Sequence, residues 1–421
     1  MRLCSPPNAS PPGAAPEEPQ QFPHWRRNRR VLPVCNFLGS LAFSIAWPFL
    51  PLMLRSLGVV EHLETWIGYM MLVFYAIGFV VSPVWGGIAD HYGRKIMVLR
   101  ASLGMGFFMT LLPFAPTPLW FAFVFMLVGF FNGFIPSGMA LLVANTPPER
   151  LGGALSVAQT GSLVGATIGP AAGAMLAAIM DRQHWLFWIS GGLLLVASGL
   201  VAAFVHEVRQ PVAGPWRIEW VRSLRELLAV PRMGSLYFLG FVVAMLWNAN
   251  VTIISIYALQ LLAADPGAGR TEAYWVGAAA MALSVSSVVA LPLWGRVLDR
   301  FDPARVLAFA TAAAALTHVP LLVLQTPLQL VLARVAFGLS AAAMQPAIIQ
   351  LLKRHAPSGM DARAISYATS FQYVASGLAP FAAGVIGPVL GLRFYFALAI
   401  ALTLGGLAMW LRNRDRPPIP H

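Results

Sequence analysis

The chain has 421 residues, of which 58% are hydrophobic and only 10% are charged. A soluble globular protein has roughly 25% charged residues, so this composition excludes a protein with an ordinary water-exposed surface. The formal net charge is +12, but the basic residues lie in short segments between apolar runs and form no contiguous basic face. We therefore expect a protein of the lipid bilayer and no nucleic acid partner.

Residues 1–24 are rich in Pro and Ala and lack the apolar core of a cleaved signal peptide, so they predict a disordered tail. The two cysteines, Cys4 and Cys35, provide neither a disulfide framework nor a metal site, and we expect no metal and no cofactor. No loop combines a nucleophile, a base and an orienting group, which is why we do not expect an enzyme.

Twelve apolar segments follow this tail, and each is long enough to cross the bilayer as a helix. They span residues 31–54, 66–88, 96–115, 118–144, 152–179, 184–206, 233–262, 272–294, 304–324, 327–352, 364–389 and 392–411. The sequence therefore predicts an all-α polytopic membrane protein with twelve transmembrane helices.

Lys and Arg are shared unevenly between the two sides of these segments. The odd-numbered loops contain only Arg55, Arg182, Arg270 and Arg393, whereas the tails and the even-numbered loops contain nearly all the others. Because positive residues favour the cytoplasmic side, this bias predicts that both termini are cytoplasmic.

The longest internal loop separates six segments from six and contains "RIEWVRSLRELL", whose apolar residues have helical spacing. We expect a short helix on the membrane surface there. The predicted organisation is a cytoplasmic tail (1–24), a six-helix bundle (25–206), a cytoplasmic linker (207–232), a second six-helix bundle (233–412) and a cytoplasmic tail (413–421).

The two halves of the sequence resemble each other at an offset of about 209 residues. "PLWFAFVFMLVG" (118–129) aligns with "PLQLVLARVAFG" (327–338), and "VWGGIAD" (84–90) aligns with "LWGRVLD" (293–299). A third stretch, 154–176, aligns with 364–386. This repeat predicts two pseudo-symmetric bundles that face each other, with a substrate site between them near the middle of the membrane.

The charged stretch "GGIADHYGRK" lies between the second and third segments. Its Gly93 permits a tight turn, and Asp90 can cap a helix N-terminus and pair with Arg94. The stretch also resembles the signature of the major facilitator superfamily, with His91 in place of the usual Arg. The matching residues are Gly86, Asp90, Gly93, Arg94 and Lys95, and the second half keeps a partial copy in Gly295, Asp299 and Arg300. The resemblance implies a loop that latches the two halves together on the cytoplasmic side.

A second stretch, "GATIGPAAG", lies in the fifth segment and is similar to the signature of the exporter branch of that superfamily. The matching residues are Gly165, Gly169, Pro170 and Gly173. Small residues four apart also allow plain close packing of helices. The resemblance is to bacterial multidrug:proton antiporters, and it implies a monomer in the bacterial cytoplasmic (inner) membrane that works by alternating access.

The resemblance further implies that helices 1, 4, 7 and 10 line a central cavity, and polar residues gather on single faces of these helices. The candidate cavity residues are Asn36, Ser40, Ser44, Trp47, Asn132, Asn248, Thr252, Arg334, Gln345 and Tyr373. Arg334 is the only basic residue well inside a span, and an intramembrane charge indicates a functional role. Its equivalent in the first half is Phe125.

We expect all Asp and Glu residues to lie in loops or tails and none within a span. Proton-coupled exporters usually protonate a buried carboxylate, so proton coupling would need another group here. The candidate proton carriers are Asp90, at the membrane boundary, and His318, in the ninth segment.

The sequence alone is compatible with three functions. Two of them transport a small-molecule substrate, and the third does not transport. The first is a proton-driven exporter of amphipathic drugs or toxic compounds. The second is a facilitator or exporter of a small neutral or anionic metabolite, such as a sugar or amino-acid derivative, without proton antiport; Arg334 favours neutral or anionic substrates because it repels cations. The third is a membrane receptor or scaffold that does not transport.

Overall fold

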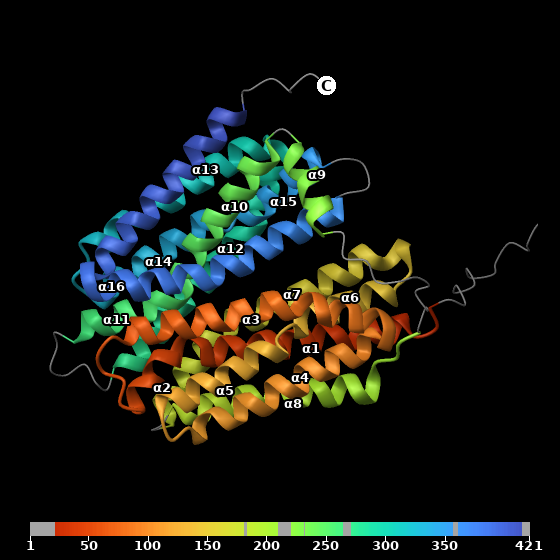
Figure 1. Cartoon of the computed structure of the whole chain (residues 1–421), viewed down its shortest axis with the longest axis horizontal. Coiled ribbons are helices and arrows are strands. Elements are labelled where there is room, and N and C mark those ends of the chain that lie inside the picture. The colour runs from red at the N-terminus through yellow and green to blue at the C-terminus, as the bar shows by residue number, and fades with distance from the viewer. Residues whose placement is uncertain are drawn as a thin grey trace, which may run out of the picture.

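The computed structural model describes residues 22–180, 183–208, 220–230, 232–263, 271–356 and 361–414. Every regular element in these ranges is a helix (Figure 1). Eleven segments of the described chain are long and apolar enough to cross a membrane. The last of them, Tyr367–Asn413, has 47 residues.

That last segment contains two spans. At 1.5 Å per residue it would be about 70 Å long, more than twice the thickness of the hydrocarbon core. The helix α16 (Asp361–Arg414) that carries it breaks at Gly391, whose φ of 82° and ψ of 154° are not helical. The predicted twelve-helix architecture is thereby confirmed.

The N-terminal bundle is built from eight helices that form six spans. They are α1 (Trp25–Ala46), α2 (Leu50–Ser56), α3 (Leu63–Tyr92), α4 (Arg94–Leu111), α5 (Pro118–Phe131), α6 (Phe134–Ala144), α7 (Pro148–Ile179) and α8 (His184–Phe204). A 3₁₀ turn containing Pro48 joins α1 to α2, because proline has no N–H to continue the α-helical ladder. Gly133, with a φ of 121°, joins α5 to α6.

The C-terminal bundle contains the remaining spans. Its helices are α10 (Met233–Asn248), α11 (Ile254–Leu262), α12 (Glu272–Arg300), α13 (Pro303–Leu316), α14 (Pro327–Ala341), α15 (Met344–His355) and α16. A π-helical turn, η3 (Ala249–Ile253), joins α10 to α11. The helix α9 (Trp220–Ala229) lies between the bundles in sequence, which confirms that the 207–232 segment contains a short helix.

Equivalent contacts recur in both bundles at the predicted offset. The indole of Trp85 donates to the carbonyl of Phe130 at 3.2 Å, and the indole of Trp294 donates to the carbonyl of Leu339 at 2.7 Å. Both residues of the second pair lie 209 positions after those of the first. The structure therefore confirms the pseudo-symmetry.

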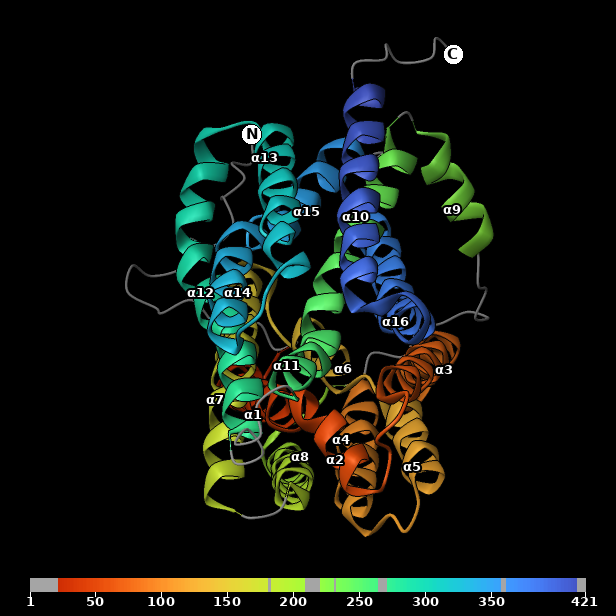
Figure 2. The same cartoon turned by 90° about the vertical axis from the view of Figure 1, so that its left-hand side faces the viewer.

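The two bundles meet at the end where α2 and α11 lie, on the left of Figure 1 and nearest the viewer in Figure 2. We call this end the closed end. There the Thr65 hydroxyl of α3 donates to the carbonyl of Gly384 in α16 at 2.7 Å. The rings of Tyr69 and Phe381 pack edge to face with centroids 5.3 Å apart. The opposite end carries the start of α1, the turn at Gly93 and the end of α16.

Candidate substrate cavity

A cavity of about 390 Å³ lies between the two bundles. Its wall includes Phe43, Ser44, Trp47, Phe74, Tyr75, Asn132 and Pro170 from the N-terminal bundle, and Trp247, Val251, Ser284, Arg334 and Tyr373 from the C-terminal bundle. A second cavity of about 590 Å³ adjoins it, since both are lined by Ala166, Trp247 and Ser284. These volumes lie in the range of pockets that bind drug-sized molecules.

Most of the predicted cavity residues line one of these two spaces. Ser44, Trp47, Asn132, Arg334 and Tyr373 line the first cavity, and Asn248 and Gln345 line the second. Asn36 and Ser40 differ from the prediction, because they are buried inside the N-terminal bundle and are absent from the described lining of either cavity. They share a helix with Ser44, but helix periodicity alone does not say where along that helix the cavity begins.

The sequence analysis missed several aromatic wall residues. Phe74 and Tyr75 lie on α3 and Trp247 lies on α10, and all three line the first cavity. The Trp47 ring packs against Phe43 and Phe74 with centroids 5.6 and 5.3 Å away. Aromatic residues in a membrane span suit a lipid-facing surface equally well, so their positions carried no signal before the helices were placed.

Arg334 is the one charged residue among the described residues that line the two cavities. Its side chain is only 2% exposed, and it is held by groups of its own bundle. Its Nε donates to the carbonyl of Ala279 at 3.1 Å. Its Nη1 donates to Oδ1 of Asn250 at 3.1 Å and also to the Asn250 carbonyl. These acceptors offset part of the high cost of burying a charge in a membrane protein.

Asn250 lies in the π-helical turn η3, and the sequence analysis did not identify it. A π turn inserts an extra residue into the helix, and such turns are frequent at functional sites. The insertion also rotates the residues that follow relative to an ideal α-helix. A face assigned from Asn248 by regular spacing therefore overlooks Asn250, which is 1% exposed.

His318 lies in the ninth span, between α13 and η5 (Val319–Leu322). Its Nδ1 is 2.7 Å from the carbonyl oxygen of Ala314, and its Nε2 is 2.5 Å from Nδ2 of Asn250. The ring packs edge-on against Phe337 with centroids 4.7 Å apart. One of the two candidate proton carriers is therefore joined to the cavity arginine through a single amide.

Some predicted site positions cannot be placed in this way. Gly86, Asp90 and Thr252 lie in described helices, but the surroundings of Gly86 and the side chains of Asp90 and Thr252 are outside the described part of the structure. The roles of Asp90 as a latch residue and as a proton carrier therefore stay predictions.

The described part of the latch motif forms a turn that is tied to its own bundle. Gly93 has a φ of 103°, which only glycine adopts without strain. The backbone N–H groups of Arg94 and Lys95 donate to the Glu207 carboxylate at 2.7 and 2.9 Å. A carboxylate at a helix N-terminus is favourable because it meets unpaired N–H groups and the positive end of the helix dipole. The cap on α4 thus comes from Glu207, a residue assigned to the linker.

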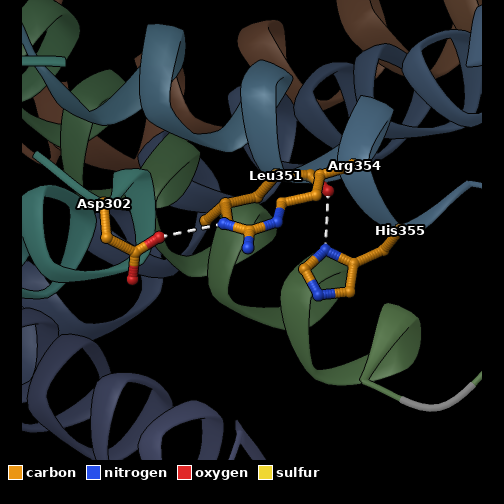
Figure 3. A network of polar contacts seen from close by, with 4 residues as sticks. All are labelled: Asp302, Leu351, Arg354 and His355. Carbon is orange, nitrogen blue, oxygen red and sulfur yellow. Dashed lines mark hydrogen bonds and ion pairs between the residues drawn. The ribbon is translucent and has the colours of Figure 1, made fainter. Parts of the chain in front are cut away.

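The partial copy of the motif lies at the equivalent end of α12. Gly295, Asp299 and Arg300 are exposed there. Two residues after Arg300, Asp302 pairs with Arg354 at 3.1 Å (Figure 3). This pair joins the turn between α12 and α13 to the end of α15 within the C-terminal bundle.

The glycine motif of α7 packs against α1. Its residues are Gly165, Gly169, Pro170 and Gly173. A Cβ added at Gly165 would lie 2.9 Å from the backbone nitrogen of Leu41, and one at Gly173 would lie 2.6 Å from the carbonyl oxygen of Ile45. Larger residues would push the two helices apart. The packing explains the glycines physically, and Pro170 additionally lines the first cavity.

An ion pair that the sequence analysis missed joins the bundles at the closed end. Nη1 of Arg55, in the last turn of α2, is 2.9 Å from Oε1 of Glu272, in the first turn of α12. Glu272 is the first residue of this span, so the expectation that no span contains a carboxylate is wrong at this end. Neither residue belongs to a motif, and only the packing of the two bundles shows that they meet.

Two pseudo-symmetric six-helix bundles around a shared, partly polar cavity define a secondary transporter of the membrane. The family model described as "Major Facilitator Superfamily" matches residues 34–261 and 236–421. This chain therefore belongs to the major facilitator superfamily.

Relatives and solved structures agree with this membership. Multidrug resistance protein MdtG of Salmonella dublin is 32% identical over 397 residues, which is 93% of this chain and 97% of the relative. The same-named protein of an Escherichia coli strain is 30% identical over 94% of this chain and 98% of the relative. The fold resembles that of the nucleoside transporter NupG, with a TM-score of 0.73, 11% sequence identity, and coverage of 93% of this chain and 100% of that chain. It also resembles that of the human organic anion transporter MFSD10, with a TM-score of 0.64, 16% sequence identity, and coverage of 92% of this chain and 100% of that chain. All four are transporters, which agrees with the prediction that this chain is not an enzyme.

Proposed function

We propose that this protein exports amphipathic drugs or toxic compounds from bacteria, as a monomer in the cytoplasmic membrane with both termini in the cytoplasm. The observation that carries the proposal is the cavity between the bundles, which is lined by Trp47, Phe74, Tyr75 and Trp247 and in which Arg334 is the one charged residue of the described wall. A broad aromatic wall binds flat apolar molecules without strict selectivity. The names of the relatives, multidrug resistance proteins, support the same substrate class.

Alternating access follows from the contacts between the bundles. With the termini in the cytoplasm, the closed end faces outward, and the cavity is reached from the cytoplasmic side. Opening outward requires that the Arg55–Glu272 pair and the Thr65–Gly384 hydrogen bond break. In the outward-open form the latch residues, including Arg94 and Asp299, would approach the opposite bundle.

Proton coupling is part of the proposal and rests on the resemblance to drug:proton antiporters. We expect a neutral or anionic substrate, because Arg334 would repel a cation and the described wall contains no carboxylate to attract one. The second candidate function, a facilitator of a small neutral or anionic metabolite, is favoured by the same arginine.

Flux in proteoliposomes under an imposed pH gradient tests the proposal. We expect accumulation of neutral lipophilic compounds that an uncoupler abolishes. Flux that ignores the gradient would remove the antiport part and favour the facilitator. Absence of flux for every lipophilic and metabolite probe would favour a receptor or scaffold.

A further inference from the structure

The hydrogen bonds around Asn250 determine which way its side-chain amide points. Arg334 can only donate, so the atom of Asn250 that faces its Nη1 is the acceptor Oδ1. The carbonyl of Leu246 can only accept, and Nδ2 of Asn250 donates to it at 2.9 Å. Two neighbours therefore impose the same orientation independently, and turning the amide over would break both hydrogen bonds.

This orientation restricts the charge of His318. The second hydrogen on Nδ2 of Asn250 points to His318 Nε2, which must accept it. The other ring nitrogen faces the carbonyl of Ala314, so the ring proton lies on Nδ1. A second proton, on Nε2, would face an N–H group, and two donors cannot bond to each other. The observed network therefore requires a neutral His318.

We propose that Asn250 couples proton binding at His318 to the position of Arg334 in the cavity wall. A proton that adds to His318 Nε2 displaces the Asn250 side chain, so Nη1 of Arg334 loses the Oδ1 acceptor and the guanidinium is held only by the backbone carbonyls of Asn250 and Ala279. Loss of the proton from the same nitrogen restores the bridge. Asn250 is a positioning residue in this scheme, because it acts on the cavity through Arg334.

The other titratable or charged side chains near His318 do not offer an alternative to Asn250 as the group that responds to proton binding. Tyr257 of α11 donates to the carbonyl of Leu321 at 2.7 Å, and Arg393 of α16 donates to the carbonyl of Leu324 at 3.0 Å. Together with Arg334, these are the titratable or charged side chains that meet the stretch around His318 in the described part of the chain. None of them is a carboxylate that could balance a protonated ring.

The consequence for the substrate follows from charge. While His318 is neutral, Arg334 is withdrawn into the wall and the cavity presents mainly aromatic surface. When the bridge breaks, the guanidinium has lost its side-chain acceptor and turns toward water in the cavity, and an apolar neutral molecule loses its site. Proton binding and a neutral substrate would thus exclude each other, as antiport requires. The inference rests on the proposed function and identifies neutral amphipathic molecules as the class that protons expel.

The test measures binding of the neutral fluorophore N-phenylnaphthylamine to the full-length protein in detergent between about pH 8 and about pH 5. We expect the wild-type affinity to fall about tenfold or more at the lower pH. In His318→Gln the glutamine carbonyl can still accept from Asn250 but cannot be protonated, so its affinity should stay constant. Asn250→Leu should also abolish the pH dependence of the affinity, because leucine cannot transmit protonation of His318 to Arg334.

A directional variant separates this coupling from a purely structural role. In Asn250→Asp a carboxylate faces Nε2 and favours the protonated ring, so the midpoint of the affinity change should move up by about 1–3 pH units. His355→Gln is the matched control, because His355 Nδ1 also lies 2.8 Å from a carbonyl four residues earlier, that of Leu351, but far from the cavity (Figure 3). It should behave as wild type.

Two results would overturn the inference. One is a wild-type affinity that does not change over this pH range, and the other is an unchanged pH dependence in either His318→Gln or Asn250→Leu. Because binding is measured without a gradient, the inference can fail while gradient-driven flux in proteoliposomes still supports the proposed function. Conversely, pH-dependent binding with flux that ignores the gradient would leave the coupling network standing and remove antiport.

Discussion

The two halves of the molecule fill equivalent interior positions in different ways. Phe125 in the N-terminal bundle and Arg334 in the C-terminal bundle lie 209 residues apart, at matching places in the repeat. The Phe125 ring is fully buried and packs against Phe74 and Trp47, with centroids 5.1 and 5.4 Å away. Arg334 instead bonds to Asn250, which reaches His318.

This difference separates two physical tasks that one fold must combine. Close-packed aromatic side chains have one good arrangement, and they hold helices in fixed positions. A buried polar network can have two arrangements if a proton changes which groups donate and which accept. We therefore expect the N-terminal bundle to serve as the firmer frame and the C-terminal bundle to carry the response to protons and substrate.

The largest expected effect is on the stability of the N-terminal bundle. Phe125→Ala removes a fully buried ring and leaves a cavity beside Phe74 and Trp47. The loss should be about 3–5 kcal/mol, seen as a lower Tm of the purified protein. The pH dependence of probe binding should persist in the protein that stays folded. If Tm is unchanged, the aromatic cluster is not the frame that we describe.

The second-largest effect is expected in the C-terminal bundle, where a substitution at Arg334 should change substrate flux more than stability. Arg334→Leu removes the cost of burying a charge but leaves the carbonyls of Ala279 and Asn250 without their donor, so we expect a smaller loss of Tm than for Phe125→Ala. We expect flux of an anionic lipophilic probe to fall about tenfold or more, equivalent to about 1.4 kcal/mol, with a smaller change for a neutral probe. Flux and Tm measured on the same preparation check this. An equal loss for both probes would show that Arg334 shapes the cavity without selecting charge.

The smallest effect is expected where the halves meet. The side chains of Arg55 and Glu272 are 37% and 22% exposed, so water and salt screen their attraction. Arg55→Ala should shift the balance toward the outward-open form by only about 0.2–1 kcal/mol. Distances between spin labels at the exposed positions Val60 and Tyr274 would report the shift. Arg55→Lys keeps the positive charge, so its shift toward the outward-open form should be smaller than that of Arg55→Ala. A complete loss of the closed form would mean that this pair dominates closure.

Much of the fold was predictable, while the site was predictable only in part. Apolar length determines which segments span a membrane, and the repeat and the Lys/Arg bias follow from the order of residues along the chain. Arg334 was recognisable because a charge inside a span is rare. Asn250 was not, because the π turn changes the helical register. Asn36 was assigned to the cavity from helix spacing but is absent from the described lining of both cavities, since a helix face that meets protein need not meet an open space.

The sequence alone determined the twelve spans, the two related halves and the family signatures, because hydrophobic length and local spacing act over a few turns of one helix. Only the tertiary structure decided that Arg55 meets Glu272, that Glu207 caps α4, and that one amide joins Arg334 to His318. Such meetings depend on how bent helices from distant parts of the chain pack together. Proline breaks, positive-φ glycines and the π turn alter that packing in ways that regular periodicity does not record.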